Sequence, residues 1–139
     1  MRLQLAINVA DLDEGIAFYS KLFGDEPAKV RDGYANFAIE EPPLKLVLFA
    51  GAGEPGSINH LGVETEDVDQ VTAAEQRLSG VGLETTGVDE TQWCYAETTE
   101  TWVDGPDGGR WEWHVKTGDS ETLENVVLSG PGATSANCC

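Results

Sequence analysis

Basic residues are scarce in this sequence of 139 residues. Lys and Arg together number 8 against 25 Asp and Glu, which gives a formal net charge of −17. A protein that binds nucleic acid needs basic side chains to neutralise phosphates, and an anionic membrane surface attracts basic segments in the same way. The composition therefore argues against both partners. An acidic surface whose internal repulsion is screened by salt is typical of a halophilic protein, and we expect one here.

Cysteine is also scarce, with three residues in the chain: Cys94, Cys138 and Cys139. An odd number with two adjacent does not form a disulfide framework, so free thiols in a reducing compartment are expected. No apolar run approaches the length of a membrane-spanning helix, and the N-terminus lacks the pattern of a signal peptide. The sequence predicts a soluble, cytoplasmic protein. It leaves the oligomeric state open, with a homodimer as the candidate.

One pattern occurs twice, in residues 3–24 and again in residues 59–80. Each copy reads as a strand, an acidic helix cap, an amphipathic helix and a glycine suited to a left-handed helix end. The caps are Asp11 and Asp67, and the glycines are Gly24 and Gly80. The agreement of strands, caps and stops favours a true duplication over chance similarity.

Short apolar runs separated by turn residues follow each helix and predict further strands. These runs are residues 34–39 and 44–50 in the first copy, and 91–98, 101–104 and 111–115 in the second. The expected fold is α+β: two tandem βαβββ modules, about 1–52 and 57–117, forming an open barrel around a metal site. Residues 118–139 are expected to form a flexible C-terminal tail that ends in the cysteine pair.

Strand alternation places polar side chains on one face of three predicted strands. Successive residues point to opposite faces, so Leu5 and Val63 oppose the polar positions. The polar or small faces carry Gln4, Ala6 and Asn8; His60, Gly62 and Glu64; and Arg110, Glu112 and His114. A polar face inside a protein needs water, a ligand or a metal to satisfy it.

A metal site is the favoured interpretation of three of these residues. Gln4 and His60 occupy equivalent places in the two copies, and Glu112 supplies the carboxylate of the last strand. Imidazole and carboxylate suit iron, nickel, manganese or zinc, and three ligands leave positions open for substrate and dioxygen. Each residue taken alone is more often a solvent-facing or structural side chain, and only their matched places on the repeated strands favour the metal. His114 is the rival ligand, and we expect it to act beside the metal or on the substrate instead.

The repeat and its ligand positions resemble the vicinal oxygen chelate superfamily, which includes glyoxalase I, extradiol dioxygenases and bleomycin-binding proteins. More narrowly, several long stretches resemble the cadmium-induced proteins and the organoarsenical carbon–arsenic lyases. The resemblance covers about residues 2–117 and is carried by the segments 16–24, 27–30, 33–39, 41–48, 59–64 and 102–106. The glutamine at position 4 also fits this branch.

This resemblance implies an enzyme that cleaves the carbon–arsenic bond of trivalent organoarsenicals, using non-haem Fe(II) held by Gln4, His60 and Glu112 together with dioxygen. Thiolates hold the arsenic in such enzymes, and two adjacent cysteines stand where this chain has Trp93 and Cys94. Cys138 and Cys139 are the candidates for the missing thiol. The expected partner is therefore a small organoarsenical or a thiophilic metal.

Two other functions remain open from the sequence. One is a cadmium- or arsenite-binding sequestration protein in which Cys94, Cys138 and Cys139 do the binding. The other is a different metal-dependent dioxygenase or glyoxalase-type reaction on the same scaffold. Cys94 alone is also compatible with a buried structural thiol.

Overall fold

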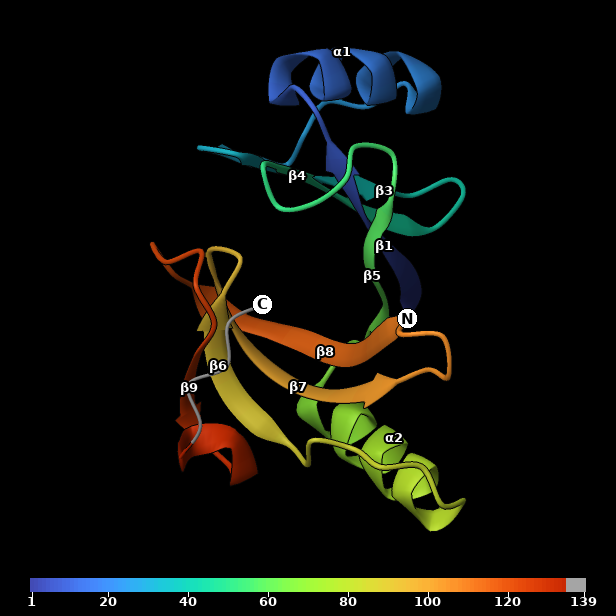
Figure 1. Ribbon diagram of the computed structural model, residues 1–139, viewed down its shortest axis with the longest axis vertical. Helices are drawn as coiled ribbons and strands as arrows, with labels where there is room; N and C mark the ends of the chain where they lie inside the picture. Colours follow the sequence, from blue (N-terminus) through green and yellow to red (C-terminus); the bar gives the residue numbers. More distant parts are fainter. Residues whose placement is uncertain (135–139) are drawn as a thin grey trace. The chain divides into compact units, whose positions relative to one another are not determined.

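The computed structural model describes residues 1–134 of the chain. These residues fall into two compact units. The N-terminal unit comprises residues 2–62, and the C-terminal unit comprises Met1 and the described residues from 63 onward. The order of elements is βαβββ in the first repeat and βαβββ followed by one extra strand in the second (Figure 1). The predicted α+β class and module order are confirmed.

The N-terminal unit is a sheet covered by one helix. Its strands lie in the order β2-β3-β4-β1-β5, with β1 parallel to β4 and β3 antiparallel to both β2 and β4. The elements are β1 (Arg2–Val9), α1 (Leu12–Phe23), β2 (Lys29–Arg31), β3 (Tyr34–Ile39), β4 (Leu44–Ala50) and the greater part of β5 (Ile58–Glu64).

Helix α1 forms where the sequence predicts it and covers an apolar core. The Asp11 side chain accepts a hydrogen bond from the Glu14 amide at 2.9 Å, and Gly24 ends the helix in the left-handed region. Beneath the helix lies a cluster of side chains with no exposed surface: Ala35, Phe37, Ile39, Leu46 and Leu48. Their burial stabilises this unit through the hydrophobic effect.

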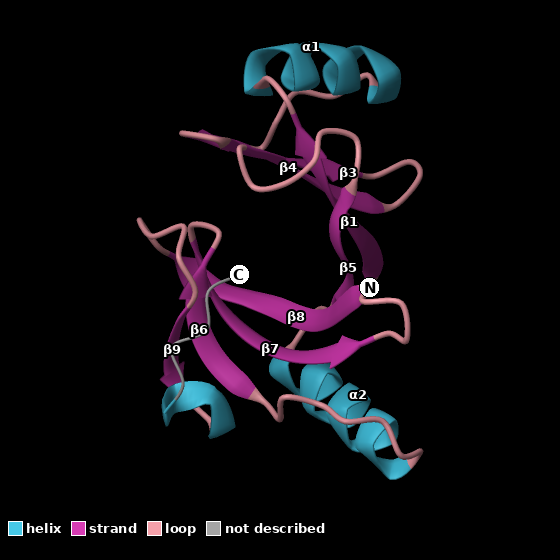
Figure 2. Ribbon diagram, viewed as in Figure 1, coloured by secondary structure: helices cyan, strands magenta, loops and turns pink. Residues whose placement is uncertain are grey.

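The C-terminal unit carries the second helix and four strands in the order β8-β7-β6-β9. Its elements are α2 (Val68–Gly80), β6 (Asp89–Trp93), β7 (Ala96–Asp104), β8 (Arg110–Asp119), β9 (Val126–Ser129) and a short 3₁₀ helix, Pro131–Thr134 (Figure 2). All three strand pairs are antiparallel. No helix among residues 1–134 is long and apolar enough to cross a membrane.

Helix α2 begins as predicted but ends differently. The Asp67 carboxylate accepts from the Gln70 amide at 2.9 Å, while the Gln70 side chain accepts from the Glu66 amide at 2.7 Å. Gly80 is the last residue of the helix instead of the left-handed residue beyond it. Gly82, with φ of 90°, takes the left-handed conformation.

The secondary structure predicted for two segments needs correction. The run 91–98 is not one strand, because Cys94 and Tyr95 both have positive φ, 52° and 60°, and form a tight turn between β6 and β7. The flexible tail predicted over residues 118–139 contains strand residues in its described part, since β8 continues to Asp119 and β9 pairs with β6. The apolar run Val126–Leu128 lies in this added strand.

The boundary between the two units falls inside β5 and not before it. The predicted second module begins near residue 57, yet residues 57–62 belong with the N-terminal unit. Backbone hydrogen bonds explain the assignment: the Asn8 amide donates to the Ser57 carbonyl at 2.9 Å, and the Gly56 amide donates to the Asn8 carbonyl at 2.8 Å. The second sequence repeat therefore begins a few residues before the second compact unit does.

Candidate functional site

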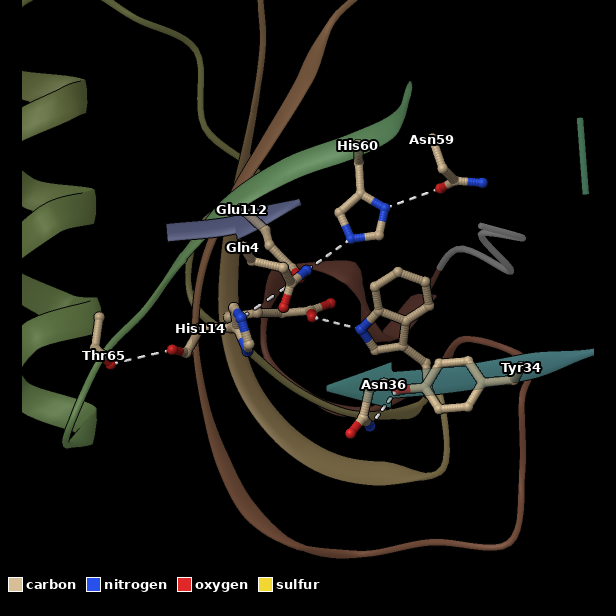
Figure 3. Close-up of polar contacts among 10 residues, drawn as sticks. Gln4, Tyr34, Asn36, Asn59, His60, Thr65, Glu112 and His114 are labelled. Carbon is tan, nitrogen blue, oxygen red and sulfur yellow. Dashed lines mark hydrogen bonds and ion pairs between the residues drawn. The ribbon is translucent and has the colours of Figure 1, made fainter. Parts of the chain in front are cut away.

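Gln4 and His60 meet inside the N-terminal unit, as the repeat predicts. Gln4 lies on β1 and His60 on β5, and each side chain is 3 % exposed. The Gln4 Nε2 and His60 Nε2 atoms are 2.9 Å apart, and the His60 Nδ1 atom lies 2.8 Å from the Asn59 Oδ1 atom (Figure 3). The structure brings together these two predicted ligands, each of which offers a donor atom that a divalent metal accepts.

Glu112 and His114 lie together on β8 of the C-terminal unit. Their side chains are 2 % and 3 % exposed, and His114 Nε2 is 3.7 Å from Glu112 Oε1. The Thr65 amide and hydroxyl both donate to the His114 carbonyl, at 2.8 and 3.1 Å (Figure 3). These hydrogen bonds fix the backbone of β8 at the point from which the Glu112 and His114 side chains project.

Glu100 is a buried acid that the sequence analysis did not select. It lies on β7 opposite His114, is 2 % exposed, and accepts a hydrogen bond from Trp93 Nε1 at 3.0 Å. Burial raises the pKa of Glu100 from 4.5 to about 8, and the neighbouring Glu112 adds to the rise. At neutral pH Glu100 is therefore a protonated carboxylic acid that shares a hydrogen bond with Glu112.

A cavity of about 280 Å³ opens beside Glu100 in the C-terminal unit. Its lining includes Asp89, Trp102, Arg110 and Asn125. The guanidinium carbon of Arg110 lies 4.3 Å from the centroid of the Trp102 ring, a cation–π contact. The cavity thus combines an aromatic wall with acidic, amide and basic groups, which suits a small polar molecule.

Of the three predicted thiol ligands, Cys94 is the one that lies among the described residues. Cys94 lies half-buried in the turn between β6 and β7, whereas Glu112 pairs with Trp102 near the other end of β7. Cys138 and Cys139 lie outside the described residues. Trp93, which occupies one of the two positions where the resemblance implies a cysteine, is buried, and its ring lies tilted at 58° to the Trp102 ring with centroids 5.6 Å apart.

The donor set is compatible with a divalent metal. Over residues 1–134, no three histidine, cysteine, aspartate or glutamate side chains gather as a metal cluster. The predicted set contains only two residues of those kinds, because Gln4 contributes an amide. Gln4, His60 and Glu112 are each almost fully buried, and an imidazole nitrogen with amide and carboxylate oxygens fits iron, manganese, nickel or zinc.

The sequence does contain a signal for Glu100, which the sequence analysis did not select. The turn at Pro106–Gly109 sets the pairing of β7 with β8, so Trp102 faces Glu112 and Glu100 faces His114. Counting outward from that turn would have placed Glu100 on the same face as the predicted ligand. The Asn59 contact has no comparable signal, because it depends on side-chain conformations.

Comparison with known proteins places the chain in a family. Residues 3–113 match the family model described as the Glyoxalase/Bleomycin resistance protein/Dioxygenase superfamily. A trivalent organoarsenical cleaving enzyme of Thermomonospora curvata is 52 % identical, with 99 % of each chain covered. The cadmium-induced protein CadI of Mycobacterium bovis is 51 % identical over 88 % of this chain and 80 % of that protein.

A solved structure extends the likeness to the fold. The Mn(II)-bound glyoxalase of Novosphingobium aromaticivorans aligns with a TM-score of 0.61 and 17 % identity, over 87 % of this chain and 40 % of that one. At that identity the likeness concerns the fold alone. The resemblance drawn from the sequence motifs, including its narrower branch, is confirmed by the relatives. The chain belongs to the Glyoxalase/Bleomycin resistance protein/Dioxygenase superfamily.

Proposed function

We propose that this protein cleaves the carbon–arsenic bond of trivalent organoarsenicals in a reaction that depends on Fe(II) and dioxygen, and so detoxifies arsenic. The observation that carries the proposal is the 52 % identity, over nearly the whole of both chains, to a protein named as a trivalent organoarsenical cleaving enzyme. A second relative with that name, from Bacillus sp., is 35 % identical over 97 % of this chain.

In this proposal Gln4, His60 and Glu112 hold the metal, with Fe(II) as the resident ion and nickel, manganese or zinc as substitutes. The burial of all three side chains supports the assignment, because a buried polar group needs a partner. When bound, Fe(II) supplies the activation of dioxygen that the cleavage requires. Glu112 is the sole anionic member of the set, so it carries most of the electrostatic attraction for the ion.

His114 and Glu100 hold Glu112 in place in the proposed site. The protonated Glu100 carboxylic acid donates toward the Glu112 carboxylate, and His114 Nε2 lies 3.7 Å from Glu112 Oε1. Both residues are buried, so water does not compete for these contacts. We assign His114 to the reacting substrate and not to ligation, and the metal content of a His114→Ala variant tests that assignment.

Thiols hold the arsenic in this proposal. As(III) is soft and prefers thiolate sulfur, and the candidates are Cys94 with Cys138 and Cys139. Cys94 is half-buried in its turn, which leaves part of its surface open to a ligand. The replacement of a neighbouring cysteine by Trp93 is the reason that we assign a role to the C-terminal pair.

Oxygen uptake and arsenite release test the proposal together. Protein loaded anaerobically with Fe(II) is exposed to oxygen with methylarsenite, and both quantities are followed. We expect repeated turnover in the wild type and none in Glu112→Gln, which keeps the shape of the side chain but removes its charge. Stoichiometric arsenical binding without oxygen uptake in the wild type would contradict the enzymatic proposal.

A sequestration function is the second candidate, and the 51 % identity to a cadmium-induced protein favours it. In this alternative the thiols bind Cd(II) or arsenite and release it unchanged. Calorimetric titration with Cd(II) separates the two candidates. Binding lost in the double variant Cys138→Ser, Cys139→Ser but kept in Glu112→Gln identifies a thiol site that works without the proposed metal ligands.

A further inference from the structure

A chain of hydrogen bonds leads from His60 to a backbone carbonyl within the N-terminal unit. It passes from one side chain to the next through β5, β1 and the loop between β4 and β5. The contacts are His60 Nδ1 to Asn59 Oδ1 at 2.8 Å, Asn59 Nδ2 to Asn8 Oδ1 at 3.1 Å, Asn8 Nδ2 to Ser57 Oγ at 3.0 Å, and Ser57 Oγ to the Glu54 carbonyl at 2.5 Å.

The carbonyl at the end of the chain sets the direction of every bond in it. A carbonyl oxygen only accepts, so the Ser57 hydroxyl donates its one proton to Glu54. The Ser57 oxygen therefore accepts from the Asn8 amide nitrogen, which turns the Asn8 oxygen toward the Asn59 amide nitrogen. The Asn59 oxygen then faces His60, and an amide oxygen cannot donate.

His60 must therefore carry its proton on Nδ1. In the neutral imidazole the proton on one nitrogen leaves the other as an acceptor. The opposite contact agrees, because the Gln4 amide nitrogen lies 2.9 Å from His60 Nε2 and donates to it. The contact at Nδ1 and the contact at Nε2 therefore give the same tautomer, although they involve different residues, Asn59 and Gln4.

Asn8 is the central member of the chain and is held on several sides. It is 5 % exposed, and its backbone amide and carbonyl both bond to the loop, at the Ser57 carbonyl and the Gly56 amide. A Cβ atom placed on Gly53 would lie 2.7 Å from Asn8 Nδ2 and 3.1 Å from its Cγ. The loop thus requires a glycine at position 53 for Asn8 to keep this position.

We infer that Asn59, Asn8 and Ser57 are positioning residues that fix His60 in the Nδ1–H tautomer and so reserve Nε2 for the metal. The inference rests on the proposed function for the identity of the metal site, but the tautomer is a property of the metal-free protein. The Gln4 amide then protects the same lone pair until a metal displaces it. Partners of this kind, which hold a metal-binding histidine by its other nitrogen, commonly contribute about 10–100-fold to metal affinity.

Long-range ¹H–¹⁵N correlation spectra of the metal-free protein read the tautomer directly. The chain has two histidines, so the His114→Gln variant identifies the His60 signals. Spectra are taken about two pH units above the ordinary histidine pKa of about 6.5, where neutral imidazoles dominate. We expect the wild type to show His60 protonated on Nδ1.

Two substitutions at Asn59 provide a matched pair. Asn59→Leu has a similar shape but offers no acceptor, so we expect the Nε2–H tautomer to gain population and Co(II) affinity to fall about 10–100-fold. Asn59→Asp keeps an acceptor oxygen for the Nδ1 proton, and we expect it to keep both the tautomer and the Co(II) affinity of the wild type.

Ser57→Ala and Gly53→Ala test the chain from its far end. Ser57→Ala removes the hydrogen bond to the Glu54 carbonyl, and Gly53→Ala displaces the Asn8 amide. Both variants should raise the population of the Nε2–H tautomer, as Asn59→Leu does, but by a smaller amount. Gly80→Ala is the control, because nothing lies within 4 Å of its added Cβ. These variants also replace Asn59→Leu if that protein does not fold.

An Nε2–H tautomer in the wild type would overturn the inference, as would an unchanged tautomer in Asn59→Leu and Ser57→Ala. A wild type that has the Nδ1–H tautomer but binds no Co(II) would instead contradict the proposed metal site. The tautomer spectra would still decide the role of the chain, because they are recorded without metal.

Discussion

The two units share one order of elements but bury different kinds of side chain. The N-terminal unit buries an apolar cluster that includes Phe37 and Leu46, with polar burial limited to Gln4, Asn8 and His60. In the C-terminal unit the buried set is mostly polar: Thr65, Asp89, Thr91, Thr98, Thr99, Glu100, Thr101, Glu112 and His114. The two units therefore share an order of elements but differ in the polarity of what they bury.

Charge and aromatic content follow the same division. The N-terminal unit has nine acidic and five basic side chains, whereas residues 63–139 have sixteen acidic and three basic ones, a net charge of −13 out of −17. All four tryptophans, residues 93, 102, 111 and 113, belong to the C-terminal unit. Tryptophan fluorescence therefore reports on one unit, which makes the comparison accessible to experiment.

The largest effect is expected in the apolar core. Leu46→Ala removes a side chain with no exposed surface and leaves a cavity, so the free energy of unfolding should fall by about 2–5 kcal/mol. Urea unfolding followed by circular dichroism measures the loss. A change below about 1 kcal/mol would mean that this core collapses around the gap, and the contrast between the units would disappear.

Metal binding should depend on Glu112 more than on its neighbour. Glu112→Ala removes the anionic ligand, and we expect Fe(II) or Ni(II) affinity to fall by more than the about 10–100-fold typical of a residue around a metal site. His114→Ala should reduce turnover more than metal content. Metal analysis after dialysis checks both variants, and the opposite ranking would make His114 the ligand.

The stability of the folded protein should depend on pH because of Glu100. Burial and Glu112 raise the pKa of Glu100 to about 8 in the folded protein, so between its ordinary value of 4.5 and pH 8 only the unfolded chain loses this proton. Stability of the metal-free protein therefore falls as pH rises through this window.

Glu100→Gln is the matched variant for that effect, because it is neutral at every pH. Relative to wild type, it should gain more than about 1.4 kcal/mol between pH 4.5 and 8, the equivalent of one pKa unit. Urea unfolding at a series of pH values measures the difference. Parallel curves for the two proteins would show that Glu100 titrates normally in the fold.

Salt should stabilise the C-terminal unit in particular. Screening weakens the repulsion among its acidic side chains, and each 1 kcal/mol gained raises the melting temperature by roughly 2–8 °C. We expect tryptophan fluorescence to report a rise between dilute buffer and molar KCl that exceeds the rise in equally concentrated sucrose. A flat curve in KCl would contradict the halophilic interpretation.

The smallest effect is expected at Thr101. Its side chain is 1 % exposed, and its hydroxyl has no hydrogen-bond partner among the described residues. Thr101→Val keeps the shape and removes the hydroxyl, so stability should rise, by less than about 1 kcal/mol. A clear loss of stability by calorimetry would show that the hydroxyl has a partner, such as a buried water.

Local signals account for the parts of this molecule that sequence reasoning predicted. Asp11 and Asp67 cap their helices as their spacing to Glu14 and Gln70 indicates, and alternation placed Gln4 on the buried face of β1. Strand β9 escaped prediction because a short, half-exposed edge strand has little apolar periodicity and forms only through its partner β6.

The turn at Cys94 and Tyr95 escaped for a related reason. Two adjacent positive φ values normally call for glycine or asparagine, and neither residue is present there. The pairing of the flanking strands, with Trp93 opposite Ala96, determines this turn. A turn that is determined by the pairing of its flanking strands cannot be predicted from the conformational preferences of its own residues.

The last described segment is anchored to the C-terminal sheet by one hydrogen bond. The Gly132 amide donates to Asp89 Oδ1 at 2.8 Å, which fixes the chain beside β6, next to the strand position of Glu100. Asp89 also lines the cavity beside Glu100, so one carboxylate both lines that cavity and binds the last described segment of the chain.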